Sequence, residues 1–293
     1  METYRKIVVG YGHVLCKLCY ANIIRYPKMI YKIQQVFLDI CDNNNLDKIW
    51  RKFEYCSIDT LDAVRIKFCL IQQRSHYSNL EVYKVAPNCS IIIKLYDELL
   101  CTNDDWITVY IYSKNKASVS CDLLALIFYT KVVYHATLQF HSSLIDIDGR
   151  GLMFLGPSGI GKTTQAELWN KYRDALIING DIVFVQETEN AFLGWGTPWH
   201  GSSPYCENTS VPVHAMIVLK QAQENSIREL SGFEKVTAVS NSVFYPQWLE
   251  NGMELCLETL DHLLSSVPVY ELSCRPDEDA VRITEEAVFG GRL

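Results

Sequence analysis

The stretch GPSGIGKTT, residues 156–164, contains the pattern G-x-x-x-x-G-K-T and decides more about the fold than any other part of the chain. Glycines let such a loop bend so that successive backbone N–H groups point inward at phosphate oxygens. The motif requires a strand before it and a helix after it. An apolar run, GLMFL, precedes it at residues 151–155, and a polar segment of good helix formers follows at residues 164–172. The sequence therefore predicts a phosphate-binding loop between a strand and a helix.

Two side chains of this loop have separate expected tasks. Lys162 would neutralise the β- and γ-phosphates of a nucleotide, and Thr163 would supply a hydroxyl to Mg²⁺. The predicted nucleotide-binding residues are Gly156, Pro157, Ser158, Gly159, Ile160, Gly161, Lys162, Thr163 and Thr164. The expected ligands are ATP, or another nucleoside triphosphate, and Mg²⁺.

Charge and hydropathy exclude several classes of protein. A net charge of −7 over 293 residues supplies no broad basic field, which argues against nucleic acid as a partner. The charged start METYRK lacks the apolar run of a secretory signal, so we expect a cytoplasmic protein. The longest apolar stretch, residues 123–140, is interrupted by Lys131, His135 and Gln139. It predicts a core helix that runs into a strand rather than a membrane span.

Eleven cysteines are scattered along the chain, most of them in apolar surroundings. Free, reduced thiols are the expectation for such a pattern. Cys16 and Cys19 form a C-x-x-C, but no second pair follows at zinc-finger spacing, so a metal or redox role is not expected there.

The chain divides into two predicted domains. Residues 1–119 carry no chemical motif, show a helical pattern at residues 29–38 and strand signals at residues 90–96 and 106–112, and are predicted to form a small α+β domain. The compositional break at residues 114–117 marks the boundary. Residues 120–293 alternate strand and helix signals and form the predicted nucleotide-binding catalytic domain. The fold class is therefore α/β, with the phosphate loop in the larger domain.

Within the larger domain the pattern is regular. A hairpin is predicted to lead into the loop, and further strands, an amphipathic helix and a last helix that opens at Pro276 and Asp277 should follow. The expected strands are residues 144–147, 151–155, 175–178, 182–185, 191–195, 213–219 and 267–272, and the amphipathic helix is residues 246–265, with its apolar stripe in the core.

Two side chains outside the loop are candidates for catalysis. Asp181 follows the apolar strand of residues 175–178, where a carboxylate can hold Mg²⁺ or accept the proton of an attacking hydroxyl. The alternative is an aspartate in a tight turn after Gly180. His141 ends an apolar run just before the hairpin and either points toward the phosphates or is a structural histidine.

The segment GTPWHGSS, residues 196–203, combines glycines, a tryptophan, a histidine and hydroxyls without periodicity. Such composition suits a loop shaped around a ligand, although a turn anchored by Trp199 would look similar. We expect Trp199, His200, Gly201 and Ser202 to form a substrate loop.

The order of these motifs resembles the HPr serine kinase/phosphorylases, whose fold is related to phosphoenolpyruvate carboxykinase. His141, the GRG and FLGPSGIGKTT motifs and then ALIINGD carry the likeness, which spans about residues 141–288. The runs GTPWHGSS and VPVYELSCRPDEDAV resemble a divergent branch associated with ribosomally made, modified peptides, including lasso-peptide tail kinases. The resemblance implies a kinase domain of this type and a homo-oligomer.

The chain departs from that family at two places. Where the serine kinases have two adjacent aspartates, this chain has Gly180 and Asp181, so one carboxylate must serve in both roles. The family's arginine-bearing substrate loop has no clear counterpart. Arg275, at a predicted strand-to-helix junction, is the preferred candidate over Arg228, and the alternative is a surface arginine at the start of a helix.

These observations predict an ATP- and Mg²⁺-dependent kinase that phosphorylates a hydroxyl, with Ser or Thr of a peptide or small protein as the leading acceptor. Lys162, Asp181 and His141 are the predicted catalytic residues, and either Asp181 or His141 is the base. A kinase for a small-molecule alcohol, such as a sugar or free serine, and a non-catalytic nucleotide-dependent sensor or scaffold are the alternatives. The amino-terminal domain is expected to dock the acceptor or a partner.

Overall fold

The structure is a computed structural model that describes residues 29–41, 46, 48–55, 62–70, 89–113 and 121–290. The Cys16/Cys19 pair, the loop at residues 42–45 and the predicted boundary at residues 114–117 lie outside these residues. All cysteines reported in the described part are free thiols, as expected.

The first half of the chain forms a mixed seven-stranded sheet, with strand order β3-β1-β2-β4-β7-β6-β5. Its strands are β1 (Met29–Ile33), β2 (Val36–Cys41), β3 (Glu54–Tyr55), β4 (Val64–Leu70), β5 (Ile91–Leu95), β6 (Glu98–Thr102) and β7 (Thr108–Ser113). A 3₁₀ helix, η1 (Lys48–Phe53), precedes β3. The strand predictions for β5 and β7 are confirmed.

The helix predicted at residues 29–38 is wrong, because β1 and β2 form an antiparallel hairpin there. The chain turns at Gln34 and Gln35, where Gln34 adopts a left-handed conformation with φ of 53°. Neither glutamine is a typical turn residue, so the apolar run reads as continuous in the sequence. In the structure its β-branched and aromatic side chains pack against a sheet instead.

The second half forms a nine-stranded sheet whose main order is β10-β8-β11-β12-β13-β16-β14, with β9 between β8 and β13 and the short β15 beside β8. Its strands are β8 (Thr137–Ile147), β9 (Arg150–Leu155), β10 (Leu176–Asn179), β11 (Ile182–Glu187), β12 (Phe192–Trp195), β13 (Ser210–Gln221), β14 (Ser226–Leu230), β15 (Val243–Phe244) and β16 (Val269–Cys274). The strands predicted in this half are confirmed, and all lie in one sheet.

Strand β8 changes partners along its length, and the change lies at the candidate site. Residues 137–141 pair with β11, whereas residues 142–147 pair with β9 and those near its end with β10. The change falls between His141 and Ser142. A point at which neighbouring strands diverge leaves a crevice at the sheet, which is where α/β proteins commonly bind ligands.

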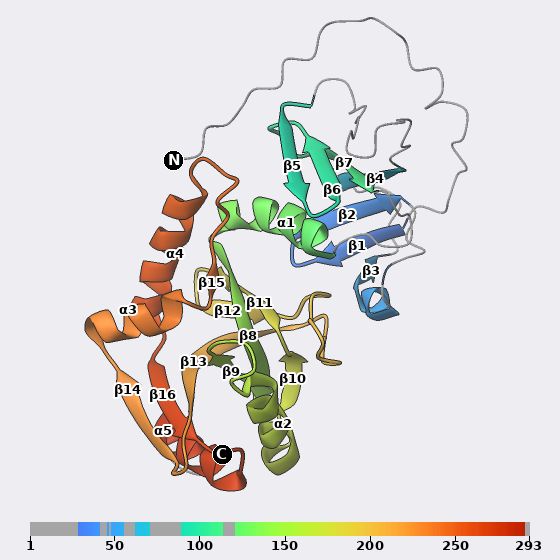
Figure 1. The fold of residues 1–293 in the computed structure, drawn as a ribbon. Coiled ribbons are helices and arrows are strands. Elements are labelled where there is room, and N and C mark those ends of the chain that lie inside the picture. Colours follow the sequence, from blue (N-terminus) through green and yellow to red (C-terminus); the bar gives the residue numbers. More distant parts are fainter. Residues whose placement is uncertain are drawn as a thin grey trace, which may run out of the picture.

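Five α-helices accompany the described part of the two sheets: α1 (Cys121–Val132), α2 (Lys162–Arg173), α3 (Gly232–Ser240), α4 (Gly252–Ser266) and α5 (Glu278–Phe289). A single 3₁₀ turn, η2 (Val133–His135), leads from α1 into β8, so the predicted helix-to-strand transition at residues 123–140 is confirmed. Helix α1 lies between the two sheets (Figure 1) and buries most of its residues. One hydrophobic core runs from the first sheet through α1 into the second.

The two carboxy-terminal helices, α4 and α5, agree to different degrees with the helices that the sequence predicts. Helix α5 begins after Asp277, as predicted, and the Asp277 carboxylate accepts the N–H of Ala280. Helix α4 begins at Gly252, six residues later than predicted, and its Met253 and Leu257 are exposed, so the expected apolar stripe is only partly in the core. No described helix combines the length and hydrophobicity that a membrane crossing requires.

The predicted α/β class is confirmed by this architecture, with the phosphate loop in the larger, carboxy-terminal part (Figure 1). Strands of the first sheet end at Ser113 and those of the second begin at Thr137. The division of the chain at residues 119 and 120 stays a prediction.

Candidate active site

The phosphate loop connects β9 to α2, the setting that its motif requires. Strand β9 ends at Leu155, and α2 begins at Lys162. Gly159 and Gly161 have φ of 78° and 113°, a region that favours glycine, and a Cβ atom at either position would meet nothing within 4 Å. Conformation rather than crowding therefore requires glycine here, as expected for a loop that turns its N–H groups toward one centre.

Lys162 folds back over the loop that precedes it. Its Nζ atom donates to the carbonyl oxygens of Gly156 at 3.1 Å and Pro157 at 3.2 Å. Only 6% of the residue is exposed. This burial lowers the pKa of the ammonium group, while the Asp181 carboxylate acts in the opposite direction. The ammonium group of Lys162 thus lies against the first residues of the phosphate loop.

The hydroxyl of Thr163 contacts the residue that precedes Asp181 in the chain. Its Oγ1 atom donates to the carbonyl oxygen of Gly180 at 3.1 Å. The same carbonyl accepts the hydroxyl of Ser143 in β8, at 3.2 Å. The turn between β10 and β11 is therefore tied both to the helix that follows the phosphate loop and to the central strand, which brings Asp181 to the loop.

His141 and Asp181 form a pair across neighbouring strands. His141 Nε2 lies 3.2 Å from Asp181 Oδ1, and the two side chains are 28% and 31% exposed. Strand pairing brings them together, because His141 is opposite Ile182 in the β8–β11 register and the N–H of Ser142 donates to the Asp181 carbonyl at 2.8 Å. A partly exposed imidazole–carboxylate pair can accept and pass on a proton. The two catalytic candidates therefore form one group.

Asn179 builds the turn that presents Asp181, although the sequence analysis gave it no role. It is fully buried, and its Oδ1 accepts the N–H groups of Asp181 at 2.9 Å and Ile182 at 3.1 Å. Its Nδ2 donates to the carbonyls of Thr197 at 3.0 Å and Trp199 at 3.2 Å. The Asn-Gly-Asp order after a buried strand is a recognisable signal for such a side-chain turn.

Residues 197–208, here called the covering loop, lie directly on this turn. A Cβ atom on Gly201 would stand 2.3 Å from Asp181 Oδ2, and one on Gly180 would stand 2.0 Å from Ser203 Oγ. Gly201 thus touches the carboxylate itself. Ser203 ends the GTPWHGSS segment but was not among the predicted substrate-loop residues, since nothing local marks a buried serine in a polar loop.

The predicted substrate-loop residues divide between core and surface. Trp199 is 4% exposed and its Nε1 donates to the Cys121 carbonyl at 2.9 Å, so it anchors the loop. His200 Nδ1 bonds the carbonyl of Ser203 within the turn, and Gly201 and Ser202 are exposed. The exposed tip of the covering loop therefore lies beside Asp181, while its tryptophan points into the core.

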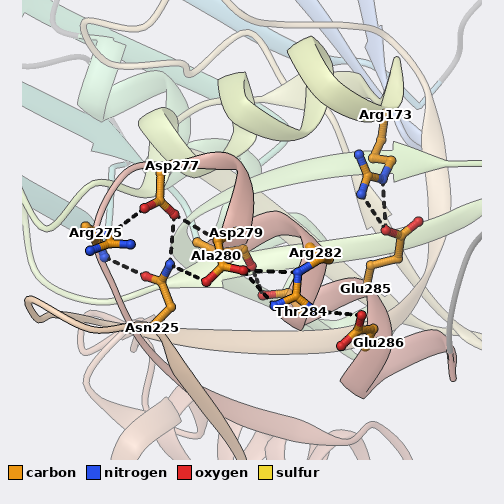
Figure 2. Close-up of polar contacts among 10 residues, drawn as sticks. All are labelled: Arg173, Asn225, Arg275, Asp277, Asp279, Ala280, Arg282, Thr284, Glu285 and Glu286. Atoms are coloured by element: carbon orange, nitrogen blue, oxygen red, sulfur yellow. Dashed lines mark hydrogen bonds and ion pairs between the residues drawn. The ribbon is translucent and has the colours of Figure 1, made fainter.

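Arg275 lies at the end of β16 in a network of its own (Figure 2). Its Nε donates to Asp277 Oδ2 at 2.5 Å, and its backbone N–H donates to Asn225 Oδ1 at 3.0 Å. Asp277 raises the pKa of this guanidinium. Arg228, the other candidate, pairs with Glu234 and Glu271 on the surface. Arg275 follows the strand parallel to β13, and β13 is parallel to β9, so it lies at the same sheet edge as the phosphate loop.

The donor set can be tested against Mg²⁺. Within the described residues, no three His, Cys, Asp or Glu side chains come together as a metal cage. Mg²⁺ bound with a nucleotide does not need such a cage, since it takes one or two protein oxygens together with phosphates and water. Thr163 and Asp181, which flank the Gly180 carbonyl, fit that role.

Loop, sheet and the His141–Asp181 pair define the class: an α/β protein with a phosphate-loop motif and an imidazole–carboxylate pair near that loop. Within this class, residues 111–275, more than half of the 293-residue chain, match the family described as SynChlorMet cassette protein ScmC, and the chain belongs to that family.

A second, partial similarity is to one curated protein. It is 25% identical over 160 residues to the HPr kinase/phosphorylase of Brevibacillus brevis, a match that spans 54% of this chain and 49% of the relative. The chain thus spans about half the length of the curated relative it matches.

Among solved structures, the Hpr(Ser) kinase/phosphatase from Coxiella burnetii is similar at 11% identity and a TM-score of 0.34. The match covers 52% of this chain and 97% of that one.

Proposed function

We propose that the protein is an ATP- and Mg²⁺-dependent kinase that transfers the γ-phosphoryl group to Ser or Thr of a peptide or small protein. The observation that carries the proposal is the His141–Asp181 pair, at 3.2 Å. Asp181 directly follows Gly180, whose carbonyl oxygen accepts the hydroxyl of Thr163 from the phosphate loop. Acid–base groups and the phosphate loop thus lie at one place. That combination suits phosphoryl transfer more than nucleotide binding alone.

The residues would divide the work as follows. Loop N–H groups and Lys162 hold the β- and γ-phosphates and oppose the charge that develops on them. Thr163 and Asp181 hold Mg²⁺, which supplies further charge neutralisation when it is bound with ATP. Positioning accounts for most of the rate enhancement in such reactions.

Proton transfer would fall to the imidazole–carboxylate pair. The acceptor hydroxyl loses its proton to Asp181 or, across the 3.2 Å contact, to His141, while its oxygen bonds to the γ-phosphorus and the bond to the β-phosphate oxygen breaks. ADP and a phosphate ester are the products. One carboxylate then serves both metal and proton, which is the consequence of glycine at position 180.

A peptide acceptor is favoured by family membership. The family is described as a cassette protein, and this description fits the association with modified peptides that the sequence motifs imply. The exposed tip of the covering loop, beside Asp181, offers a surface along which a peptide could lie.

The test measures ADP release with and without peptides encoded beside this gene, and identifies the product by mass spectrometry. Peptide-stimulated turnover with a mass gain of one phosphate on Ser or Thr is expected. Stimulation by sugars or free serine alone would replace the proposal with a small-molecule kinase. Tight ATP binding without turnover would replace it with a nucleotide sensor.

Substitution at the pair tests the mechanism. Asp181→Asn should retain most of the ATP affinity and lower turnover by roughly 10²-fold, the scale for loss of a positioned proton acceptor. Asp148→Asn, at a carboxylate that is 73% exposed in the β8–β9 turn, is the matched control and should be active. If His141→Ala abolishes turnover while Asp181→Asn is active, His141 is the base and Asp181 is a turn residue.

A further inference from the structure

The 3₁₀ helix η1 precedes strand β3 of the first sheet. It makes polar contacts with the covering loop, which connects β12 and β13 of the second sheet. Lys52 Nζ donates to the carbonyl oxygen of Cys206 at 2.7 Å and to Glu207 Oε1 at 2.6 Å. In return, the side chain of Asn208 donates to the Lys52 carbonyl at 2.9 Å. Three polar contacts therefore join one residue of η1 to three successive residues of the loop.

An aromatic contact continues the same interface into the core. The ring of Trp50 meets Trp199 edge-on, with centroids 5.7 Å apart, and meets Tyr31 of β1 in the same way at 5.3 Å. Trp50 is 2% exposed. The tryptophan that anchors the covering loop is thus packed against Trp50 of η1, which in turn packs against Tyr31 of the first sheet.

The opposite side of the loop contacts the turn between β10 and β11, which presents Asp181. Asn179 holds the carbonyls of Thr197 and Trp199, and Gly201 is so close to Asp181 that a methyl group would stand 2.3 Å from the carboxylate oxygen. The N–H of Glu207 donates to the Ile178 carbonyl of β10 at 2.8 Å. The loop is therefore fixed between η1 and the residues that present Asp181.

We propose that η1 is a positioning element of the active site, in which Trp50 and Lys52 hold the covering loop so that it orients the Asp181 carboxylate. The assignment rests on the proposed function only where turnover is the readout. It gives the amino-terminal half of the chain a role in positioning Asp181, in addition to any docking of an acceptor. Anything that displaces η1 would reach Asp181 through this loop.

Lys52 is the residue to change, because Trp50 is buried and its truncation would disturb the fold. Lys52 is 43% exposed and Glu207 is 40% exposed, and surface ion pairs of this kind add little to stability. Lys52→Met removes the donors and retains the aliphatic length. Lys52→Arg restores donors toward the Cys206 carbonyl and the Glu207 carboxylate.

Lys131→Met is the matched control. Lys131, in α1, also makes a bond of 2.7 Å to the first-sheet half of the chain, where it donates to the Asp105 carbonyl. That bond joins the two halves of the chain away from the covering loop. A general loosening between the halves would affect both variants, whereas a positioning role predicts an effect of Lys52→Met only.

Two measurements are made on each full-length variant. In hydrogen exchange, amides of residues 197–208 should exchange faster in Lys52→Met than in the wild type, Lys52→Arg and Lys131→Met. In steady-state assays, Lys52→Met should lower kcat by about tenfold, since small displacements of catalytic groups have effects of this size or larger, and leave the KM for ATP unchanged. Lys52→Arg should recover kcat.

Several results would overturn the assignment. Unchanged exchange in Lys52→Met would show that Lys52 does not restrain the covering loop. An equal loss of kcat in Lys131→Met would show that the loss comes from a general loosening between the two halves of the chain. A rise in the KM for ATP at constant kcat would show that Lys52 affects nucleotide binding and not the position of Asp181. If the wild type has no turnover with any acceptor, the proposed function fails, and the exchange comparison alone still decides whether η1 restrains the loop.

Discussion

Gly180→Ala tests whether the covering loop and the turn that presents Asp181 are packed as tightly as their geometry indicates. Gly180 has no positive φ, so alanine is compatible with its backbone. A Cβ atom there would lie 2.0 Å from Ser203 Oγ and 2.5 Å from Ser203 Cβ. Rotation of the serine side chain can move the hydroxyl away, but it cannot move the Cβ atom. The backbone at residue 180 or at residue 203 must therefore shift.

The expected cost follows from this overlap. Overpacking of a close contact destabilises a protein by about 1–3 kcal/mol. For a domain of 150–250 residues, each kcal/mol lowers Tm by about 2–4 °C. Because the Gly180 carbonyl accepts the hydroxyls of Thr163 and Ser143, the shift should also weaken protection by ATP and Mg²⁺.

Thermal and urea unfolding of a double-mutant cycle separates this overlap from other effects. Ser203→Gly removes both clashing atoms but loses the bond that the Tyr205 N–H donates to Ser203 Oγ at 3.2 Å, a loss of about 1 kcal/mol. The variant with both substitutions should be more stable than the sum of the single effects predicts, by about 1 kcal/mol or more. Additive effects, or a Gly180→Ala variant as stable as the wild type, would refute the close packing of the covering loop on this turn.

Three further substitutions test other parts of the structure. Lys162→Ala should abolish phosphoryl transfer and leave the unfolding transition intact, because the lysine opposes charge that builds on the phosphates; near-normal turnover would rule out the phosphate-loop mechanism. Thr163→Ala should weaken the Mg²⁺-dependent rise in Tm with ATP, and equal ATP protection of both proteins in excess chelator would contradict the metal assignment. Arg173→Met should cost about 3 kcal/mol in urea unfolding, because it removes the two hydrogen bonds that the guanidinium donates to Glu285, whose side chain is only 4% exposed (Figure 2). A loss below about 0.5 kcal/mol would show that water replaces the arginine.

Local signals in the sequence predicted the elements whose conformation depends mainly on neighbouring residues. The phosphate loop is a contiguous motif, and α5 begins with a capping aspartate, so both could be located without knowledge of the rest. The helix expected at residues 29–38 failed because the turn at Gln34 and Gln35 has no glycine, proline or asparagine to mark it. Short apolar runs fit a buried helix and a buried strand equally well.

The candidate site also has residues that a local motif predicts and residues whose contacts depend on strand pairing. Lys162 and Thr163 follow from the motif, whereas the roles of His141 and Asp181 were open in the sequence, which separates them by forty positions. Their 3.2 Å contact depends on the β8–β11 register, and a shift of one residue would turn one of the two side chains to the other face of the sheet.

By itself, the sequence determined the phosphate loop, the α/β class and the chemical types at the site, because backbone conformation and side-chain chemistry are properties of neighbouring residues. Only the tertiary structure decided that Asn179 builds the turn that presents Asp181, that Gly201 and Ser203 cover this turn, and that Lys52, more than a hundred residues away, contacts the covering loop. These contacts arise from strand pairing and from packing between the two sheets. Each depends on the position of distant segments, which no local pattern specifies.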